Sequence, residues 1–347
     1  MSLLSVEDLV QTFPVAGSRA LVRAVNGVSF TLARGETLAL VGESGSGKTT
    51  IGRCLLGLIT PSGGRIVFNG MEMGGKRSVR SPEIRGKLQL VFQEPSESLD
   101  PRMRLHEIIE EPLRALGLDR LERERLVKEA ARRVGLPEWL LTSYPAEISM
   151  GLQQRVGIAR AIVSKPEIIV LDEPTSALDP TARAEIIDLL IRLQRELGTA
   201  YLFISHDLSA VRQLSHRLAV LYLGMIVEQG ESAALFSQPG HPYTVGLLSS
   251  VLLPNPKIKR LTQLKLAGEI PSPIDLPKAC FLAGRCPLAE ERCRAVMPPV
   301  ETVAPGHIVR CYRTDEVMRM EQAVDYFGQF QAESDRILGA GVPRDMR

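Results

Sequence analysis

The sequence lacks several features that would place it in particular classes of protein. Its 42 lysine and arginine residues nearly balance 40 acidic residues, so the net charge of +2 gives no general electrostatic case for binding nucleic acid or an acidic membrane. The opening stretch MSLLSVEDLVQTF has no basic segment of the kind that starts a signal peptide. No run approaches the roughly 18 uninterrupted apolar residues of a membrane-spanning helix. We therefore expect a cytoplasmic protein that reaches a membrane only by docking on another protein.

Cysteine is scarce too, and four of the five cysteines crowd one C-terminal stretch, while Cys54 stands alone. In a cytoplasmic protein such a cluster favours a metal or cofactor over disulfides. Zinc sites prefer pairs of cysteines about two to four residues apart, and no such pair is present. Four thiolates can also hold an iron–sulfur cluster, so zinc and iron–sulfur have comparable weight on chemistry alone, with buried free thiols as the third alternative. The clustered residues are Cys280, Cys286, Cys293 and Cys311.

The texture of the chain predicts an α/β fold. Residues 1–92 are rich in strand patterns, whereas about 101–165 show helical spacing and form a predicted helical insert. EIIVLDE then returns to a continuously apolar strand, as parallel sheets require. A helix at about 181–196, the strand AYLFISH and a hairpin around Leu223-Gly224 follow. The whole pattern indicates a sheet core with an antiparallel β subdomain and a helical subdomain.

Proline becomes frequent after about residue 238, which marks a linker and a separate small module. We therefore predict two domains, over residues 1–237 and 238–347. The second contains the cysteine cluster.

The stretch VGESGSGKTT lies between an apolar strand and a predicted helix, and it fits the pattern G-x-x-x-x-G-K-[ST] in that context. Its glycines let backbone N–H groups turn inward around a phosphate, and the following helix points its positive end at the same place. Lys48 would reach the β- and γ-phosphates and Thr49 would ligate magnesium. The alternative is a glycine-rich turn with a chance lysine. The expected nucleotide contacts are Gly42, Glu43, Ser44, Gly45, Ser46, Gly47, Lys48, Thr49 and Thr50.

A nucleoside triphosphate site also needs an acidic residue for the metal, and IIVLDEPTS provides two carboxylates at a strand end. Asp172 would hold magnesium directly or through a water. Glu173 would polarise an attacking water. Two solvated acids at a strand terminus are the alternative, which is weaker because ligands of α/β proteins collect at this end of the strands.

These motifs resemble those of the ATPase subunit of an ABC transporter. VGESGSGKTT resembles the Walker A motif and IIVLDEP the Walker B motif. VFQEP resembles the Q-loop, SALD the D-loop and ISHD the switch motif, and all follow the family's order within residues 1–235. The resemblance implies that Gln93 contacts magnesium and the attacking water, and that His206 senses the γ-phosphate. It also places Phe13 where the family stacks an aromatic ring on adenine, although Phe13 could equally be a core residue.

The family's signature motif, usually LSGGQ, is altered to ISMGL here. The resemblance implies that Ser149 and Gly151 face nucleotide bound by the opposite subunit of a dimer. Met150 replaces the first glycine and Leu152 the glutamine. Met150 either points away, leaving a normal site, or weakens one of the two composite sites. From the second alternative we hypothesise a heterodimer with one strong and one weak site.

The C-terminal part resembles the extension of dipeptide and oligopeptide importers, through HPYTVGLLSSV and the spacing of the cysteines. That resemblance implies a 4Fe–4S cluster on the four clustered cysteines, with zinc as the alternative. The Walker motifs and the resemblance to an ABC ATPase imply ATP and Mg²⁺ as cofactors. The implied partners are a second ABC ATPase, two transmembrane permease subunits and an extracytoplasmic solute-binding protein, with no nucleic acid.

The expected activity is ATP hydrolysis that powers import of peptides or a related small solute, at the cytoplasmic face of the inner membrane. Closure of a dimer of ATPase domains around ATP would drive the cycle. Two alternatives stand beside it. One is a soluble ABC-type ATPase acting on nucleic acid or ribosomes, and the other is a regulatory module that binds nucleotide without hydrolysing it.

Overall fold

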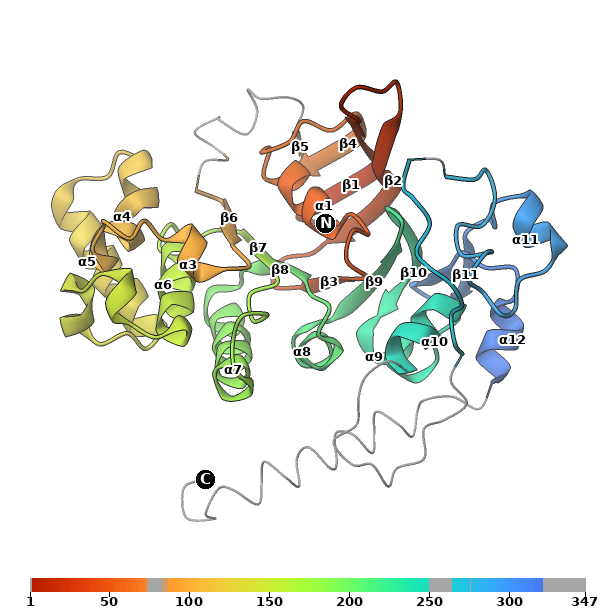
Figure 1. Ribbon diagram of the computed structural model, residues 1–347. Helices are drawn as coiled ribbons and strands as arrows, with labels where there is room; N and C mark the ends of the chain where they lie inside the picture. Colours follow the sequence, from red (N-terminus) through yellow and green to blue (C-terminus); the bar gives the residue numbers. More distant parts are fainter. Residues whose placement is uncertain (1, 74–83, 85, 250–263, 275, 321–347) are drawn as a thin grey trace, which may run out of the picture.

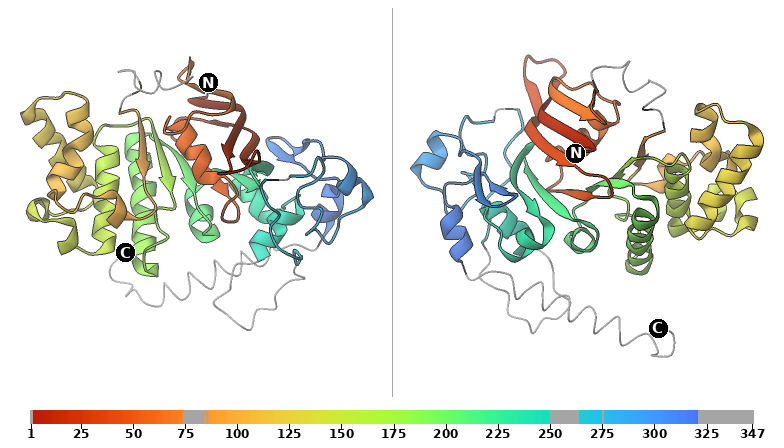
Figure 2. Two further views of the ribbon diagram at one scale, coloured as in Figure 1. Left: turned by 45° about the horizontal axis from the view of Figure 1, so that its top comes forward. Right: turned by 180° about the vertical axis from the view of Figure 1, so that it is seen from behind.

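The protein is described here by a computed structural model that covers residues 2–73, 84, 86–249, 264–274 and 276–320. Two β-sheets form its centre, the smaller near the N-terminus (Figure 1). Helices from the middle of the chain gather at one end of the larger sheet, and the C-terminal segment lies at the other end, as all three views agree (Figures 1 and 2). Residues 250 and 251 of the HPYTVGLLSSV stretch lie outside the described residues.

In the part of the chain that the structure describes, the larger sheet has eight strands in the order β11-β12-β10-β9-β3-β8-β7-β6. Its five central and edge strands β9, β3, β8, β7 and β6 run parallel, while β10, β12 and β11 continue it antiparallel. The strands are β3 (Thr37–Val41), β6 (Leu88–Val91), β7 (Ile168–Asp172), β8 (Ala200–Ile204), β9 (Arg217–Tyr222), β10 (Met225–Glu231), β11 (Glu301–Ala304) and β12 (His307–Val309).

Strands β3, β7 and β8 are apolar along almost their whole length because both faces of the sheet are covered. Alternate residues enter two different cores: Leu38 and Leu40 pack on one side, Ala39 and Val41 on the other. The first core also contains helix α1 (Lys48–Leu55) and the small sheet, and the second contains helices α7 (Pro180–Leu197) and α8 (Leu208–Leu214). This sandwich fixes the carboxyl ends of the strands, where the loops that follow them meet.

The smaller sheet is antiparallel, with the strand order β2-β1-β4-β5. Its apolar side chains, among them Leu4, Val28 and Phe68, enter the same core as α1. The turn between its last two strands is Asn69-Gly70, with positive φ at both residues, as a tight hairpin requires. Its strands are β1 (Leu4–Pro14), β2 (Leu21–Leu32), β4 (Gly63–Phe68) and β5 (Met71–Glu72).

The helical insert predicted at about 101–165 corresponds to the helices between β6 and β7. Two of them begin at good N-caps: Asp119 accepts a hydrogen bond from the Glu122 amide, and Ser149 accepts one from the Leu152 amide. The elements of this part are α3 (Pro95–Ser98), α4 (Leu105–Ala115), α5 (Arg120–Arg133), the 3₁₀ turns η1 (Glu138–Thr142) and η2 (Pro145–Glu147), and α6 (Met150–Ile162).

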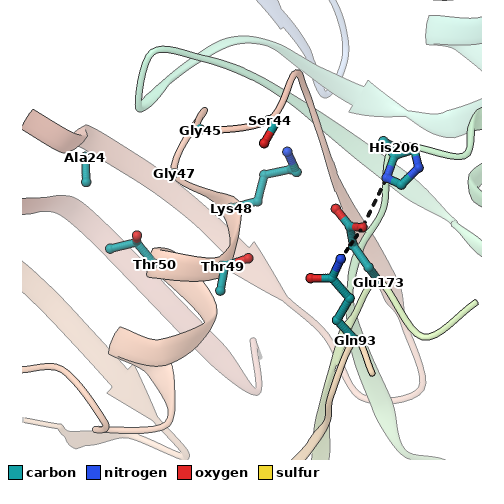
Figure 3. A pocket seen from close by; sticks show the side chains of 10 residues that line it. All are labelled: Ala24, Ser44, Gly45, Gly47, Lys48, Thr49, Thr50, Gln93, Glu173 and His206. Carbon is teal, nitrogen blue, oxygen red and sulfur yellow. Dashed lines mark hydrogen bonds and ion pairs between the residues drawn. The ribbon is translucent and has the colours of Figure 1, made fainter. Parts of the chain in front are cut away.

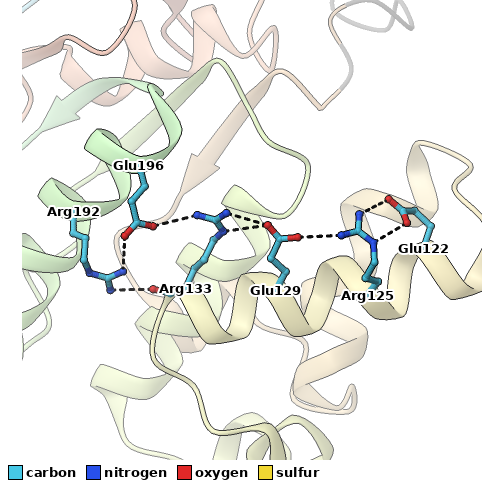
Figure 4. A network of polar contacts seen from close by, with 6 residues as sticks. All are labelled: Glu122, Arg125, Glu129, Arg133, Arg192 and Glu196. Carbon is cyan, nitrogen blue, oxygen red and sulfur yellow. Dashed lines mark hydrogen bonds and ion pairs between the residues drawn. The ribbon is translucent and has the colours of Figure 1, made fainter.

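A row of ion pairs connects α5 with α7 (Figure 4). Arg133 bonds Glu129 on its own helix and Glu196 on α7, at 3.0 and 3.1 Å. Arg192 on α7 donates to the Arg133 carbonyl oxygen at 3.0 Å. Such partly exposed pairs each contribute little to stability, so the row chiefly sets the orientation of the insert against the core.

The C-terminal segment is attached to the main sheet by β12, whose Val309 and Ile308 pair with Glu228 and Gln229 of β10. Glu228 is fully buried and accepts hydrogen bonds from the amides of Gly240 and His241 at 2.6 and 3.1 Å. The elements of the C-terminal segment are α9 (Ser232–Ser237), α10 (Pro242–Ser249), α11 (Glu291–Ala295), β11, β12 and α12 (Thr314–Arg319).

The prediction that Cys280, Cys286, Cys293 and Cys311 bind an iron–sulfur cluster or zinc is wrong. Within the described residues, no group of three or more His, Cys, Asp or Glu side chains could hold a metal ion. All four cysteines are free, and Cys280 and Cys286 pack against the second core. Burial raises the pKa of Cys286 to about 11 and that of Cys311 to about 12, which favours neutral thiols. These cysteines therefore act as small apolar side chains, the third alternative that the sequence left open.

None of the helices in the described ranges is long and apolar enough to cross a bilayer.

Candidate nucleotide-binding site

The loop between β3 and α1 wraps a turn so tight that two of its glycines have no room for a side chain. Gly47 has φ +98°, and a Cβ there would lie 2.2 Å from the carbonyl oxygen of Ala24. A Cβ on Gly42 would lie 2.2 Å from the carbonyl oxygen of Leu221. Backbone from β2 and from the end of β9 thus closes against the loop. Only glycine allows this approach, which leaves the loop amides at the mouth of a cavity.

That cavity has a volume of about 600 Å³ and opens at the carboxyl ends of the parallel strands (Figure 3). Its walls come from β2, the loop, the start of α1 and the segments after β6, β7 and β8. The residues that line it are Ala24, Ser44, Gly45, Gly47, Lys48, Thr49, Thr50, Gln93, Glu173 and His206.

Lys48 is 6% exposed and its ammonium is bonded inside the loop. Its Nζ donates to the carbonyl oxygens of Gly42 and Glu43 at 2.8 and 2.9 Å, and lies 3.3 Å from Ser46 Oγ. Burial lowers the pKa of Lys48, and the nearby carboxylates of Glu173, Asp172 and Glu43 oppose this effect. A buried cation whose hydrogen bonds go to neutral carbonyls and a hydroxyl favours an anionic ligand in the adjoining cavity.

Thr49 and Asp172 approach each other from α1 and β7. The Thr49 hydroxyl donates to Asp172 Oδ1 at 3.0 Å. Burial raises the pKa of Asp172, and the hydrogen bond from Thr49 opposes that rise. A hydroxyl and one carboxylate are hard oxygen donors of the kind magnesium uses at nucleotide sites, where phosphates and waters supply most of its ligands. The two residues therefore fit a magnesium ion, and such a site needs no second protein carboxylate.

Glu173 brings three of the predicted motifs together. Its Oε2 lies 3.2 Å from Gln93 Nε2 and 3.2 Å from His206 Nδ1 (Figure 3). Its backbone has φ 47°, in the left-handed region, and the Glu173 amide donates to the Ile204 carbonyl at 2.9 Å. Backbone strain of this kind at a non-glycine residue is typical of functional positions.

Six predicted nucleotide contacts do not line the cavity, namely Phe13, Gly42, Glu43, Ser46 and the two signature residues Ser149 and Gly151. Gly42 and Ser46 are buried, and Ser46 is 4% exposed. The side chain of Glu43 turns toward the C-terminal segment and forms an ion pair with Arg285. Phe13 is half-buried on β1, paired with Val22 of β2. A role for Phe13 in stacking on adenine stays a prediction.

The altered signature motif lies at the start of α6, away from this cavity. Ser149 caps the helix, with its Oγ 3.5 Å from the Leu152 amide. Met150 is the first helical residue and is 42% exposed. A Cβ on Gly151 would make only ordinary contact with Ala182, at 3.5 Å. Ser149 and Met150 are exposed and Gly151 is partly exposed in the single chain, and none of the three lines the cavity.

Sequence reasoning missed the residues that surround the loop from outside it. Ala24 lines the cavity through its backbone approach to Gly47, and no sequence pattern announces such a contact. Tyr243 and Arg285 touch Glu43 from more than 190 residues away. Tyr243 belongs to the HPYTV stretch and Arg285 precedes Cys286, so both lie in stretches that the sequence singled out for other reasons.

Comparison with known families agrees with this geometry. The ABC transporter family model matches residues 25–176, and a model named oligopeptide/dipeptide transporter, C-terminal region, matches residues 227–293. A probable peptide ABC transporter ATP-binding protein, y4tS, of Sinorhizobium fredii is 44% identical over 317 residues, which is 90% of each chain. The chain belongs to the ATP-binding proteins of the ABC transporter family. The resemblance drawn from its motifs is thereby confirmed.

Other members of the family agree. The putative oligopeptide transport ATP-binding protein YkfD of Bacillus subtilis is 42% identical over 315 residues, covering 90% of this chain and 95% of YkfD. The ATP-binding cassette MJ0796, solved as a dimer in a post-hydrolysis state with ADP and phosphate, matches with a TM-score of 0.59 and 27% identity over 66% of this chain and 98% of its own. The cassette cbiO1 of Clostridium perfringens gives 0.61 and 28%, over 71% and 95%.

Membership makes this ABC ATPase an ATP-hydrolysing enzyme that uses ATP and Mg²⁺. The P-loop core predicted from the sequence is confirmed. A soluble ABC-type ATPase of nucleic acid or ribosomes is not favoured, because the curated relatives that match 90% of the chain are named as transport proteins.

Proposed function

We propose that this ABC ATPase powers the import of peptides through a membrane transporter. The main support is that one chain contains both a P-loop cavity and a C-terminal segment that matches the oligopeptide/dipeptide transporter model over residues 227–293. A related small solute is the alternative cargo. ATP binding would close two ATPase domains around the nucleotide, and hydrolysis would reopen them. The γ-phosphate acts as the switch because it favours the closed state alone.

We assign phosphate binding to the loop residues 42–50. The loop amides and the N-terminus of α1 surround the phosphates, and Lys48 exchanges its carbonyl partners for phosphate oxygens. Thr49 and Asp172 would hold magnesium, with Gln93 as a further oxygen ligand. When bound, magnesium supplies positive charge that offsets the negative charge of the phosphates.

We assign activation of water to Glu173. Its carboxylate would accept a hydrogen bond from a water, orient that water toward the γ-phosphorus and take its proton as the new P–O bond forms. The bond from the γ-phosphorus to the bridging oxygen then breaks, which leaves ADP and phosphate. Gln93 and His206 both contact the Glu173 carboxylate and so fix its direction. The exposed His206 ring would turn to donate to the γ-phosphate when ATP is present.

We propose that the partner ATPase completes the site. Ser149 and Gly151 at the start of α6 would face the nucleotide held by the other subunit, because they lie outside the cavity of their own chain. The exposed Met150 side chain stands at that surface, which supports a heterodimer with one weak composite site. The remaining proposed partners are two transmembrane permeases and an extracytoplasmic solute-binding protein. The chain would then work at the cytoplasmic face of the inner membrane.

We retain the division into an ATPase domain, residues 1–237, and a C-terminal extension, residues 238–347. Its support is that the ABC transporter model lies wholly within the first range, while most of the second model falls in the second.

The function is tested in proteoliposomes that contain the assembled transporter, with ATP turnover and uptake of a labelled peptide mixture measured together. Glu173→Gln should lower turnover by roughly a hundredfold or more and abolish uptake, while ATP stays bound. Glu124→Gln is the control, because that carboxylate on α5 pairs with Arg120 at the surface. ATP turnover at the wild-type rate in Glu173→Gln would show that Glu173 does not activate the attacking water. ATP turnover by the wild-type transporter without any uptake of peptide would refute the proposal that peptides are the cargo.

A further inference from the structure

We propose that Arg285 is a positioning residue for the phosphate-binding loop, so that the C-terminal segment controls how well this ATPase binds nucleotide. The inference rests on the nucleotide site of the proposed function and adds a regulatory partner within the same chain. It is carried by the contact between Arg285 and Glu43, which joins the second residue of the loop to a residue 242 positions later.

The contact is a two-pronged ion pair. Arg285 Nη1 donates to Glu43 Oε2 at 2.9 Å, and Nη2 donates to Oε1 at 3.1 Å. The Arg285 side chain is 10% exposed and that of Glu43 is 28% exposed. A bidentate pair that is largely shielded from water has fixed geometry and is stronger than an exposed ion pair. It therefore fixes the direction of the Glu43 side chain.

The backbone of Glu43 is held from the same side. Its amide donates to the Tyr243 hydroxyl at 2.8 Å. Tyr243 packs on Tyr222 with ring centroids 4.7 Å apart, and Arg285 Nη1 lies 3.4 Å from the Tyr222 hydroxyl. Tyr243 and Arg285 of the C-terminal segment and Tyr222 of β9 thus form a single cluster around Glu43.

Arg285 itself is carried by a rigid turn. Its amide donates to the Leu282 carbonyl at 2.8 Å, and its carbonyl accepts from the Ala267 amide at 2.9 Å. Leu282 is 2% exposed and belongs to the second core. The guanidinium therefore has a fixed base from which to hold the loop.

The cluster acts on nucleotide through Lys48. The Glu43 carbonyl accepts a hydrogen bond from Lys48 Nζ at 2.9 Å and from the Ser46 amide at 3.2 Å. A displaced Glu43 would move both the lysine and the turn whose amides meet the phosphates. Arg285 also neutralises a carboxylate that would otherwise stand beside an anionic ligand. Loss of Arg285 should therefore weaken nucleotide binding through position and through charge.

The test measures binding of the non-hydrolysable analogue AMPPNP with Mg²⁺ to the full-length chain by calorimetry, together with KM and kcat for ATP. Arg285→Gln should raise the dissociation constant and KM roughly tenfold, the loss of about one charge-assisted hydrogen bond, with a change in kcat below about threefold. The double variant Glu43→Gln/Arg285→Gln should bind roughly threefold more tightly than Arg285→Gln, because the uncompensated carboxylate is gone, while the part of the loss that comes from the missing positioning contact remains. Arg292→Gln, in the same segment but paired with Glu290, is the control and should bind normally.

A purely packing role for Arg285 would leave the double variant as weak as Arg285→Gln, and that outcome overturns the proposal. Normal binding by Arg285→Gln overturns it as well. Thermal unfolding of each variant monitors folding. Should Arg285→Gln not fold, Arg285→Lys is used in its place, because lysine keeps the charge but cannot form the bidentate pair. Arg285→Lys should bind AMPPNP roughly two- to fivefold more weakly than wild type, and unchanged binding rejects the proposal. If the wild-type chain binds no AMPPNP, the nucleotide site fails. If Lys48→Ala loses binding while Arg285→Gln does not, only the positioning role fails.

Discussion

His206 Nδ1 and Glu173 Oε2 lie 3.2 Å apart, although the two residues are more than 30 positions apart in the sequence. The Glu173 side chain is 19% exposed, whereas that of His206 is 64% exposed. The histidine is therefore free to turn between the carboxylate and a ligand in the cavity, while the carboxylate stays in place. Gln93 contacts the same oxygen of Glu173 at 3.2 Å from the other side.

His206→Ala should lower kcat for ATP hydrolysis by roughly a hundredfold and change KM little, because the histidine orients Glu173 and meets the γ-phosphate rather than the rest of the nucleotide. Steady-state kinetics on the assembled complex measure both constants. His106→Gln on α4, where the ring contacts the Leu141 carbonyl, is the control. A rise in KM with unchanged kcat would show that His206 serves binding alone.

Thr49→Ala should raise the Mg²⁺ concentration for half-maximal turnover by at least roughly tenfold, because it removes a hydroxyl that bonds Asp172 and fits the metal. Thr49→Ser keeps that hydroxyl and should stay near wild type. Magnesium titrations at saturating ATP give the values. Equal requirements for magnesium in the alanine and serine variants would show that the Thr49 hydroxyl does not contribute to magnesium binding.

The fold and the loop were predictable from the sequence because their signals are local. The apolar runs of β3, β7 and β8 reflect burial on both faces, and the spacing of Gly42, Gly47 and Lys48 is dictated by the turn they make. These patterns need no knowledge of distant residues. The Leu223-Gly224 hairpin followed for the same reason and is confirmed by the pairing of β9 with β10.

What sequence could not supply depends on long-range packing. The clustering of the four C-terminal cysteines and the resemblance to importer extensions suggested a metal, but the burial of Cys280 and Cys286 against the core and the raised pKa values of Cys286 and Cys311 come from the tertiary structure. The ion pair of Arg285 with Glu43 joins two residues whose local patterns have no relation to each other. Charge pairs of this kind leave no periodic trace in one sequence.

The burial of His241 should make the stability of the fold depend on pH. His241 is 2% exposed, and burial lowers its pKa to about 3 from 6.5, against a hydrogen bond with the Arg310 backbone that raises it. The folded chain thus keeps the ring neutral, while the unfolded chain takes up a proton below about pH 6.5. The stabilisation is fully present above that pH and is lost as the pH falls toward 3, at about 1.4 kcal/mol per pH unit.

Urea unfolding at pH 7, 6 and 5 measures this slope. His241→Asn keeps an acceptor for the Tyr243 amide, which bonds His241 Nδ1 at 3.1 Å, but it cannot take up a proton. The variant should be less stable at pH 7 and should lose less free energy of unfolding on acidification than wild type, by up to about 1.4 kcal/mol per unit. Parallel curves for the two proteins would refute the assignment to His241.

Gly47 and Gly45 provide a matched pair that separates backbone strain from close approach. Both have positive φ, +98° and +78°, so alanine costs about 1–2 kcal/mol of conformational energy at either position. A Cβ at Gly45 meets nothing within 4 Å, whereas one at Gly47 would lie 2.2 Å from the Ala24 carbonyl oxygen, far closer than van der Waals contact allows.

Gly47→Ala must therefore push the loop away from β2 and displace the amides that meet the phosphates. We expect Gly45→Ala to bind AMPPNP within roughly tenfold of wild type, and Gly47→Ala to bind at least roughly a hundredfold more weakly, as misplacement by about an ångström does elsewhere. Calorimetry on both full-length variants decides the matter, since equal losses would mean that strain alone, and not the contact with β2, shapes the loop.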